Sequence, residues 1–523
     1  MLGPTLTDHP APPKLRALAS PDLMGGATLA CFLLAILVPS ARPQLLAAAT
    51  LAASIWVGWD ALGDDRRGPR ARLVMSLCLL MLASLPALLL AFHRQLWISP
   101  PRLRGLSAGL VLWSLGIAAI AVGTRASRLF SPARPWSPAA SIPRGPRPLM
   151  VVAAIVLSSV AAFVYNVGGA ACYFQDLNNS AAATAGLTYL IWGISFAKYA
   201  AFAHLGENWL SDRRNSPAVL AATAVAFLLL LSVGSRLLVL VSMIQLLVLY
   251  AALRPLGRQL VLRVTAAALV GAVVFVGVGE LRRWENVGSQ ASCQASARPH
   301  TVAVRRGRKH LRGHPKVAPR PSVAPRPSVA PRPSFAHYFV RTGVPDLPST
   351  YVNNYADTVR SSIIVRQVVP AHAAYEYGKE FLRLLLQPIP GGIRPQIAQA
   401  PALRAAFTSG HDNGSSLPLP VEGYIEFGLP GDIVFCLMLG LAVGLVDRRG
   451  GRARDVGVVL ATIAIGTGLA VIFRGSLHNA FAIAAIDVTG FLVTHRLLYR
   501  RSPMPASIAA PAPAASAVAA PTP

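Results

Sequence analysis

Long apolar runs separated by short polar connections dominate the pattern along this chain. We expect each run, of about 20 residues, to form a helix that crosses roughly 30 Å of hydrocarbon, alone or with some tilt. The pattern predicts an all-α, polytopic integral membrane protein of about twelve spans. The predicted spans cover residues 25–40, 44–62, 73–92, 105–123, 149–168, 183–204, 217–233, 237–253, 264–280, 429–446, 456–473 and 479–495.

Composition agrees with a chain placed in lipid. Only 13% of its 523 residues are charged and 54% are hydrophobic, whereas soluble domains carry about 25% charged residues. The formal net charge of +28 does not indicate a nucleic-acid partner, because most arginines lie in short connections between apolar runs, where they set orientation.

The arginines follow the parity of the spans. Every even-numbered connection is basic, and the short odd-numbered ones carry few Lys or Arg, apart from Arg94, Arg102 and Arg104 after the third span. Basic connections face the cytoplasm. The sequence therefore predicts a cytoplasmic N-terminal tail (1–24), helices 1–9 within 25–280, an extracytoplasmic loop (281–428), helices 10–12 within 429–498, and a cytoplasmic tail (499–523) that is Ala/Pro-rich and disordered.

The large loop between helices 9 and 10 has two parts. Residues 289–334 are basic and end in three copies of Val-Ala-Pro-Arg-Pro-Ser, which predicts a disordered or extended Pro/Arg-rich insert. Residues 335–428 are the ordered part. Apolar residues at helical spacing from Tyr351 to Val369 and from Tyr375 to Gln387 predict amphipathic helices that lie over the membrane face.

The five cysteines form no framework. Cys31, Cys78 and Cys436 lie in apolar runs, and Cys172 and Cys293 lie in predicted outer loops. Cys172 and Cys293 either pair or remain two separate thiols.

Candidate anion-binding residues are arginines at the predicted outer face. A guanidinium keeps its charge and presents a fork of donors that matches phosphate oxygens. Each of these arginines could instead be an interfacial anchor or a solvated charge. The candidates are Arg236 and Arg474 in helical hairpins, and Arg360, Arg366 and Arg394 in the ordered part of the loop.

Candidate general bases lie at the same face. His411 and His478 could take a proton from a sugar hydroxyl near neutral pH, and Glu422 and Glu426 are alternatives. The alternative for the two glutamates is a purely structural role, in which their negative charges stabilise a helix N-terminus. No nucleotide-binding or metal-binding motif is found in the sequence, so no cofactor and no metal are predicted.

The order of these segments resembles the Wzy-type O-antigen polymerase (oligosaccharide repeat-unit polymerase) family, whose architecture is shared with O-antigen ligases. The resemblance covers roughly residues 230–498. Family members usually carry Pro-Arg or Pro-Lys where this chain has Pro390-Gly-Gly-Ile-Arg394, and the Pro/Arg insert has no expected counterpart. The resembling pieces are Gly234-Ser235-Arg236, Tyr377-Gly378, Phe381-Leu382, Pro388-Ile389-Pro390, Gly414-Ser415-Ser416, Glu422 to Gly431, and Arg474-Gly475.

The resemblance implies a glycosyltransferase of the bacterial inner membrane. Such enzymes polymerise oligosaccharide repeat units at the outer face, with polyprenyl pyrophosphate as the leaving group and without a nucleotide. It implies undecaprenyl-pyrophosphate-linked oligosaccharide as substrate, the lipid bilayer as surroundings, and a flippase and a chain-length regulator as protein partners. The arginines would stabilise the departing pyrophosphate, and a His or Glu would deprotonate the acceptor hydroxyl.

Three other functions remain in competition. An O-antigen-ligase-like glycan transferase uses the same layout. A multi-span secondary transporter is common at this size, but transporters usually show two similar halves and a cytoplasmic central linker, whereas the longest loop here is predicted outside. A lipid-phosphosugar glycosyltransferase would need an acidic residue in the first outer loop, and Ser40 to Gln44 holds none.

Overall fold

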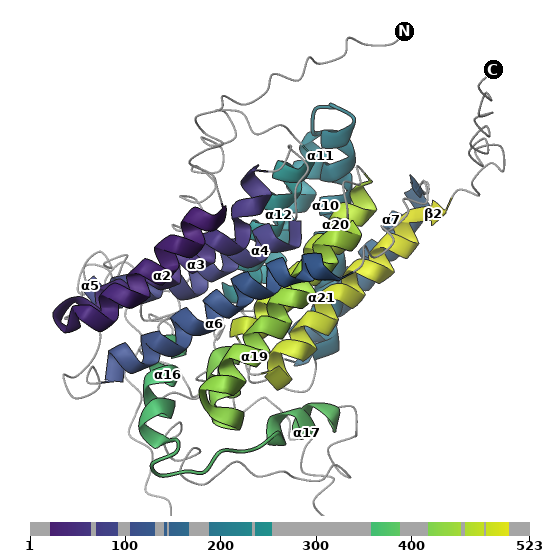
Figure 1. Ribbon diagram of the computed structural model, residues 1–523. Helices are drawn as coiled ribbons and strands as arrows, with labels where there is room; N and C mark the ends of the chain where they lie inside the picture. Colours follow the sequence, from purple (N-terminus) through teal and green to yellow (C-terminus); the bar gives the residue numbers. More distant parts are fainter. Residues whose placement is uncertain are drawn as a thin grey trace, which may run out of the picture.

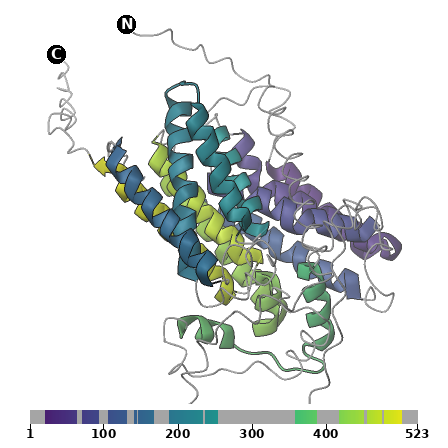
Figure 2. The ribbon, with the colours of Figure 1, turned by 180° about the vertical axis from the view of Figure 1, so that it is seen from behind.

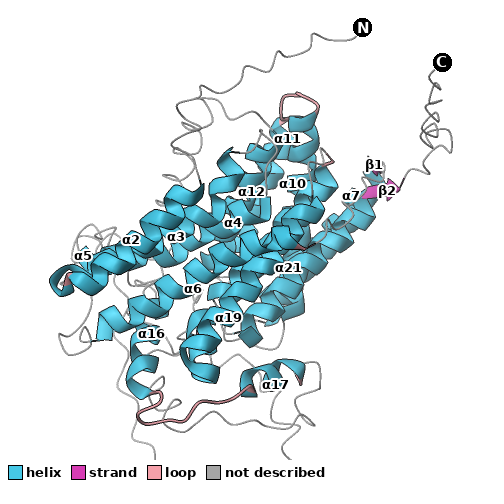
Figure 3. Cartoon of the chain, in the orientation of Figure 1, coloured by secondary structure: helices cyan, strands magenta, loops and turns pink. Residues whose placement is uncertain are grey.

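The structure is a bundle of helices (Figures 1 and 3). This computed structural model describes residues 21–63, 70–92, 105–130, 141–143, 146–166, 188–232, 236–253, 357–386, 417–450, 455–474 and 477–501. Two three-residue strands, β1 (Ser141–Pro143) and β2 (Tyr499–Arg501), pair antiparallel at one edge. The helices are α2 (Pro21–Leu37), α3 (Arg42–Gly63), α4 (Arg70–Leu79), α5 (Leu85–Phe92), α6 (Leu106–Ala126), α7 (Pro146–Asn166), α10 (Thr188–Leu210), α11 (Pro217–Ser232), α12 (Arg236–Leu253), α16 (Asp357–Val368), α17 (Lys379–Leu385), α19 (Leu419–Gly450), α20 (Val456–Arg474) and α21 (Leu477–Leu498).

The predicted spans coincide with helices wherever the structure describes them; span 264–280 lies outside the described residues. By length and composition, four of the described helical segments could each cross a membrane. A fifth is added if α2 and α3, which meet at a bend of 119°, count as one broken span. The four segments are Arg70–Phe92, Leu106–Leu129, Leu419–Gly450 and Val456–Phe473.

Contacts place the connections after the second, fourth and tenth predicted spans together at one end of the bundle. Arg448 at the end of α19 donates to the main-chain carbonyls of Ser127 and Phe130, just after α6. The carboxylate of Asp447 accepts the N–H groups of Ala71 and Arg72 at 2.6 and 3.0 Å, so it satisfies two free donors at the start of α4. We call this the basic end, defined by the connection between α10 and α11, the end of α19 and strand β2 (Figure 1), which carry Arg213, Arg214, Arg448, Arg449 and Arg501.

Helices α16 and α17 lie at the opposite end (Figures 1 and 2). Both match the amphipathic helices predicted in the large loop. α17 ends at Leu385, ahead of the Pro/Gly run that was expected to stop it. The insert 289–334, Cys172 and Cys293 lie outside the described residues, while Cys31, Cys78 and Cys436 are free thiols.

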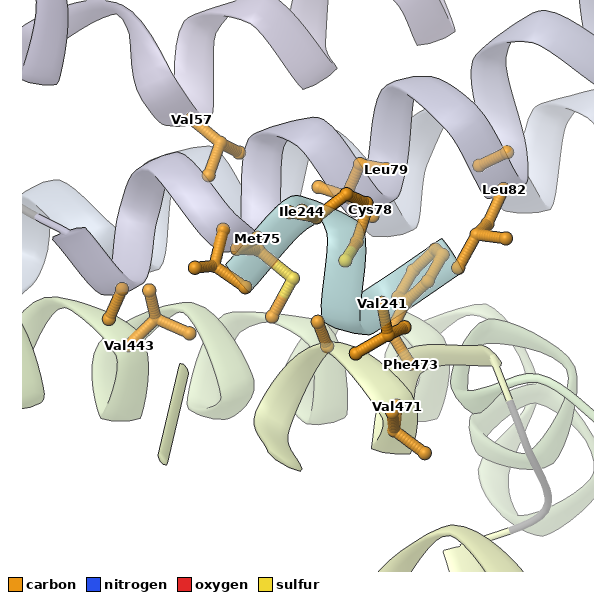
Figure 4. Packing of buried hydrophobic residues seen from close by; sticks show 14 of the residues in the cluster. Val57, Met75, Cys78, Leu79, Leu82, Val241, Ile244, Val443, Val471 and Phe473 are labelled. Carbon is orange, nitrogen blue, oxygen red and sulfur yellow. The ribbon is translucent and has the colours of Figure 1, made fainter. Parts of the chain in front are cut away.

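The core joins helices from both halves of the chain. Met75 and Cys78 of α4, Ile244 of α12 and Phe473 of α20 belong to one buried cluster (Figure 4). The ring of Trp113 in α6 meets that of Phe473 edge-on, with centroids 5.1 Å apart. Close-packed apolar side chains thus hold together helices that are distant in sequence.

One predicted boundary agrees with the structure and one is wrong. The tenth span is predicted to begin at residue 429, and α19 breaks at Phe427 and Gly428, so the helix after the break begins there, while the turns from Leu419 to Glu426 form a separate arm before it. Gly428 has φ +71°, which a glycine adopts without strain, so the chain bends there and packs the preceding turns back against the bundle. Residues 499–501, expected within a disordered tail, form β2, because β1 supplies a partner strand from far away in sequence.

Candidate functional site

The candidate site lies where the segment from α16 to α17 meets the first turns of α19, at the end of the bundle opposite the basic end (Figure 1). The 419–426 arm of α19 is buried, and the turn between α16 and α17 runs along it. Two segments of the predicted loop therefore share one surface.

Main-chain hydrogen bonds fasten the turn to the arm. Glu376 N–H donates to the carbonyl of Ile425 at 3.0 Å, and Tyr377 N–H donates to the carbonyl of Glu426 at 3.2 Å. Gly378 N–H donates to the carboxylate of Glu426. The backbone turns sharply at this point, since Tyr377 has φ +48° and Gly378 has φ +90°. The side chain of Glu426 thus fixes the start of α17.

An arginine lies beside a tyrosine at the other end of the turn. Arg366 donates to the hydroxyl of Tyr424 at 2.6 Å, and its guanidinium carbon lies 4.9 Å from the Tyr424 ring centroid. That hydroxyl donates in turn to the carbonyl of Val369 at 3.2 Å. Arg366 is exposed, so a charge with a fixed direction faces outward from α16.

Aromatic side chains connect the two ends of the turn. Tyr375 lies between Tyr424 and Tyr377, with ring centroids 6.1 Å from each. Tyr377 contacts Phe427 at 6.3 Å. The pKa of the Tyr375 phenol is raised above its ordinary value, mainly by partial desolvation and to a lesser extent by the neighbouring Tyr424 hydroxyl. This phenol therefore remains a hydrogen-bond donor at neutral and mildly alkaline pH.

The two predicted glutamates are buried within the arm. Glu422 is 1% exposed and Glu426 is 0% exposed. The carboxylate of Glu426 already receives the Gly378 N–H. Both carboxylates lie inside the arm, whereas a general base has to lie within hydrogen-bond distance of the proton that it takes.

The predicted arginines and histidines are brought together only in part. Arg366 and the half-buried Arg360 both lie on α16. Arg236 begins α12, Arg474 ends α20 and His478 is in the first turn of α21. These three helix ends lie at the same end of the bundle as α16 (Figure 1). The side chains of the three residues lie outside the described part of the structure. Arg394 and His411 are outside the described residues altogether.

Sequence reasoning missed the charged residues inside the bundle. Lys198 of α10 pairs with Asp487 of α21, and the same carboxylate accepts from the Tyr199 hydroxyl at 2.7 Å and the Gln245 amide at 2.9 Å. Each is a polar residue within an apolar run, which in membrane helices is a signal of structural or functional importance.

Asp432 was missed as well. It follows the break in α19 and is fully buried, with the Cys436 thiol 3.5 Å from one carboxylate oxygen. Among the described residues, its second oxygen has no hydrogen-bond partner. An added Cβ at Gly116 of α6 would lie 2.8 Å from this side chain, so the glycine makes room for the carboxylate.

The described residues contain no group of three or more His, Cys, Asp or Glu side chains that could hold a metal ion. No family model, no curated protein and no solved structure matches this chain.

Proposed function

We propose that this chain is a membrane glycosyltransferase that polymerises polyprenyl-pyrophosphate-linked oligosaccharide repeat units into a surface polysaccharide. In this proposal it spans the bacterial inner membrane about twelve times, with both termini in the cytoplasm. The α16–α17 end then faces outward, where lipid-linked repeat units are joined. Because glycosyl transfer from a lipid pyrophosphate needs no nucleotide, the proposal calls for no cofactor.

One observation carries the proposal: a fixed guanidinium and a row of aromatic rings lie together at the end of the bundle opposite the basic end. Arg366 is held by Tyr424, with the Tyr375 and Tyr377 rings next in line. A guanidinium suits phosphate oxygens, and amphipathic aromatic rings suit ligands that are apolar on one side and polar on the other. The distribution of basic connections supports the orientation.

The chemistry follows from these groups. The acceptor hydroxyl oxygen forms a bond to the anomeric carbon of the donor sugar. The bond between that carbon and the pyrophosphate oxygen breaks, and the pyrophosphate leaves with the electron pair. Arginine stabilises the charge that develops on the pyrophosphate. The hydroxyl proton passes to a base, for which we propose His411 or His478, since Glu422 and Glu426 are buried.

Glycan analysis of a deletion strain tests this function. We expect single repeat units on the acceptor in the deletion strain, and long chains after complementation. Long chains that remain unattached would instead indicate the ligase-like transferase. Unchanged glycan would exclude both activities.

The arginines are tested in the same strain. Arg366→Ala, Arg236→Ala and Arg474→Ala should each reduce polymerisation by roughly 30- to 1,000-fold, because the loss of one charge-assisted contact costs on the order of 2–4 kcal/mol of barrier. Lysine should restore activity in part, since it keeps the charge and loses the bidentate fork. Arg213→Ala at the basic end is the matched control. Wild-type rates in all three variants, at normal protein levels, would leave these residues as interfacial anchors.

A secondary transporter is the second candidate, favoured by the buried Lys198–Asp487 pair. Charged residues inside membrane bundles often mark ion or proton pathways. In a transporter, the neutral double variant Lys198→Met/Asp487→Leu would abolish activity even if it folded. In the polymerase, the same variant should retain glycan synthesis wherever it folds.

A further inference from the structure

Two irregular backbone segments meet at the candidate site and hold each other in place. Tyr377 has a left-handed backbone at φ +48°, which is rare for a residue with a side chain. On the opposite segment, Phe427 leaves helical geometry (φ −141°, ψ 17°) and Gly428 follows at φ +71°. Such conformations persist only where the surroundings enforce them, and they often occur at ligand sites.

Each irregular segment presents an aromatic side chain to the outside. Tyr377 is 69% exposed and Phe427 is 44% exposed, and their centroids lie 6.3 Å apart with the rings inclined by 70°. Exposed aromatic residues that adjoin each other are uncommon unless they contact a ligand, another chain or lipid. The fixed backbone gives this pair one orientation.

The pair continues into a row that ends on a positive charge. From Phe427 the rings run through Tyr377 and Tyr375 to Tyr424, with neighbouring centroids 6.1 to 6.3 Å apart. The guanidinium of Arg366 lies 4.9 Å from the Tyr424 ring centroid. Tyr424 itself is buried, so a ligand on this surface meets the exposed rings of Phe427 and Tyr377 first and the exposed Arg366 at the far end.

We propose that Tyr377 and Phe427 form an aromatic ledge that binds sugar rings of the lipid-linked glycan, and that Glu426 is the positioning residue that holds this ledge. This inference rests on the proposed function, and it names the part of the substrate that the site contacts. The ring faces carry negative potential, which attracts the C–H face of a sugar. Arg366 at the end of the row complements the pyrophosphate to which that sugar is joined.

The alternative occupant is the membrane interface, where Tyr and Phe also gather. An interfacial anchor does not require a fixed backbone, because it slides among headgroups. Here the turn is bound at Glu376, Tyr377 and Gly378 by the Ile425 and Glu426 groups. That degree of preorganisation favours a ligand of defined shape.

The role of Glu426 follows from its contacts. Its main-chain carbonyl accepts from Tyr377 N–H at 3.2 Å, and its carboxylate accepts from Gly378 N–H. Glu426→Gln keeps an acceptor oxygen in the same place, so it should retain most of the activity. Glu426→Ala removes that acceptor and should release the turn. If Glu426 were a general base, both variants would lose activity, because glutamine cannot take the hydroxyl proton any more than alanine can.

A photoreactive side chain tests the ledge directly. In the full-length chain and the complemented deletion strain, Tyr377 is replaced by p-benzoylphenylalanine and the cells are irradiated. Phe92 is the matched control, since it is a 64% exposed aromatic residue at the end of α5 and lies outside the row. We expect a carbohydrate-containing adduct at position 377 and none at position 92. An adduct with phospholipid alone, or equal carbohydrate adducts at both positions, would overturn the proposal.

Chain length gives an independent readout. Tyr377→Ala should lower the amount of long-chain glycan by roughly 3- to 10-fold, the contribution typical of one aromatic contact. Tyr377→Phe keeps the ring and should lose less than Tyr377→Ala, and Phe92→Ala, outside the row, should remain close to wild type. If the deletion abolishes polymerisation but the Tyr377→Ala variant makes glycan of wild-type length, the ledge is rejected and the proposed function still stands. Normal glycan in the deletion strain would reject the function itself.

Discussion

At the scale of single residues, Lys198 and Asp487 place opposite charges in the interior of the bundle. Lys198 is 2% exposed and Asp487 is 5% exposed. The carboxylate also receives the Tyr199 hydroxyl and the Gln245 amide, and the same amide reaches Thr467 at 2.9 Å. One acidic group thus joins α10, α12 and α21, with α20 attached through Gln245.

We predict that removing one partner of this pair is worse than removing both. Lys198→Met or Asp487→Leu alone leaves a buried charge without its counterion, which costs about 3–5 kcal/mol. The double variant Lys198→Met/Asp487→Leu leaves no charge and should recover much of that loss. Thermal unfolding of the purified protein in detergent measures the difference, with the exposed Lys379→Met as control. Additive losses in the double variant would contradict a direct coupling between the two residues.

At the scale of elements, α6 and α19 are packed through glycines. An added Cβ at Gly123 would overlap the carbonyl of Leu437, and one at Gly440 would overlap the carbonyl of Ile120. At Gly444 it would lie 2.7 Å from the Thr124 carbonyl oxygen. Small residues allow helix backbones to approach this closely. In a lipid bilayer the hydrophobic effect does not favour helix association, so such close packing contacts are what stabilise it.

Gly440→Ala should therefore lower the unfolding temperature. Its methyl group meets backbone of α6, which cannot move aside as the end of a side chain can, and overpacking typically costs about 1–3 kcal/mol. Gly26→Ala in α2 is the matched control, because no atom lies within 4 Å of its added Cβ. The control should be neutral or more stable by up to about 1 kcal/mol, since alanine favours helix. A stabilised Gly440→Ala variant would show that α6 and α19 are less tightly packed than described.

At the scale of the whole molecule, the two ends of the bundle differ in character. The basic end carries short connections with paired arginines, such as Arg213-Arg214 and Arg448-Arg449. The opposite end carries α16, α17 and the aromatic row. Among the described helices, α10 and α19 end at the basic end, and α19 starts at the opposite one.

Epitope insertion tests the proposed orientation. A tag after Arg213 or after Arg449 should be detected only in permeabilised spheroplasts, and a tag after the exposed His372 in the turn between α16 and α17 should be detected in intact ones. The arginine distribution is the physical reason. Detection of the Arg449 tag in intact spheroplasts would overturn the proposed orientation of the last three helices.

Sequence alone determined the elements of the bundle. Apolar runs at Leu106–Ala126 and Val456–Arg474 predict helices because a long apolar segment satisfies its backbone groups internally only as a helix. The amphipathic α16 and α17 were predicted from helical spacing in the same way. Arg366 was identified as a candidate from its place in the ordered part of the large loop, although no feature of the neighbouring sequence indicated Tyr424 as its partner.

Only the tertiary structure decided which groups meet. Glu426 and Gly378 are far apart along the chain, and their hydrogen bond exists because Gly428 turns the 419–426 arm back towards the turn before α17. The same packing buries Glu422 and Glu426, which sequence had offered as bases, and exposes Tyr377, which it had noted only as part of the Tyr377-Gly378 motif. The periodicity and composition of a segment indicate its secondary structure and which of its faces is apolar. They carry no information on which distant segment supplies a partner, because that choice depends on the packing of the whole bundle.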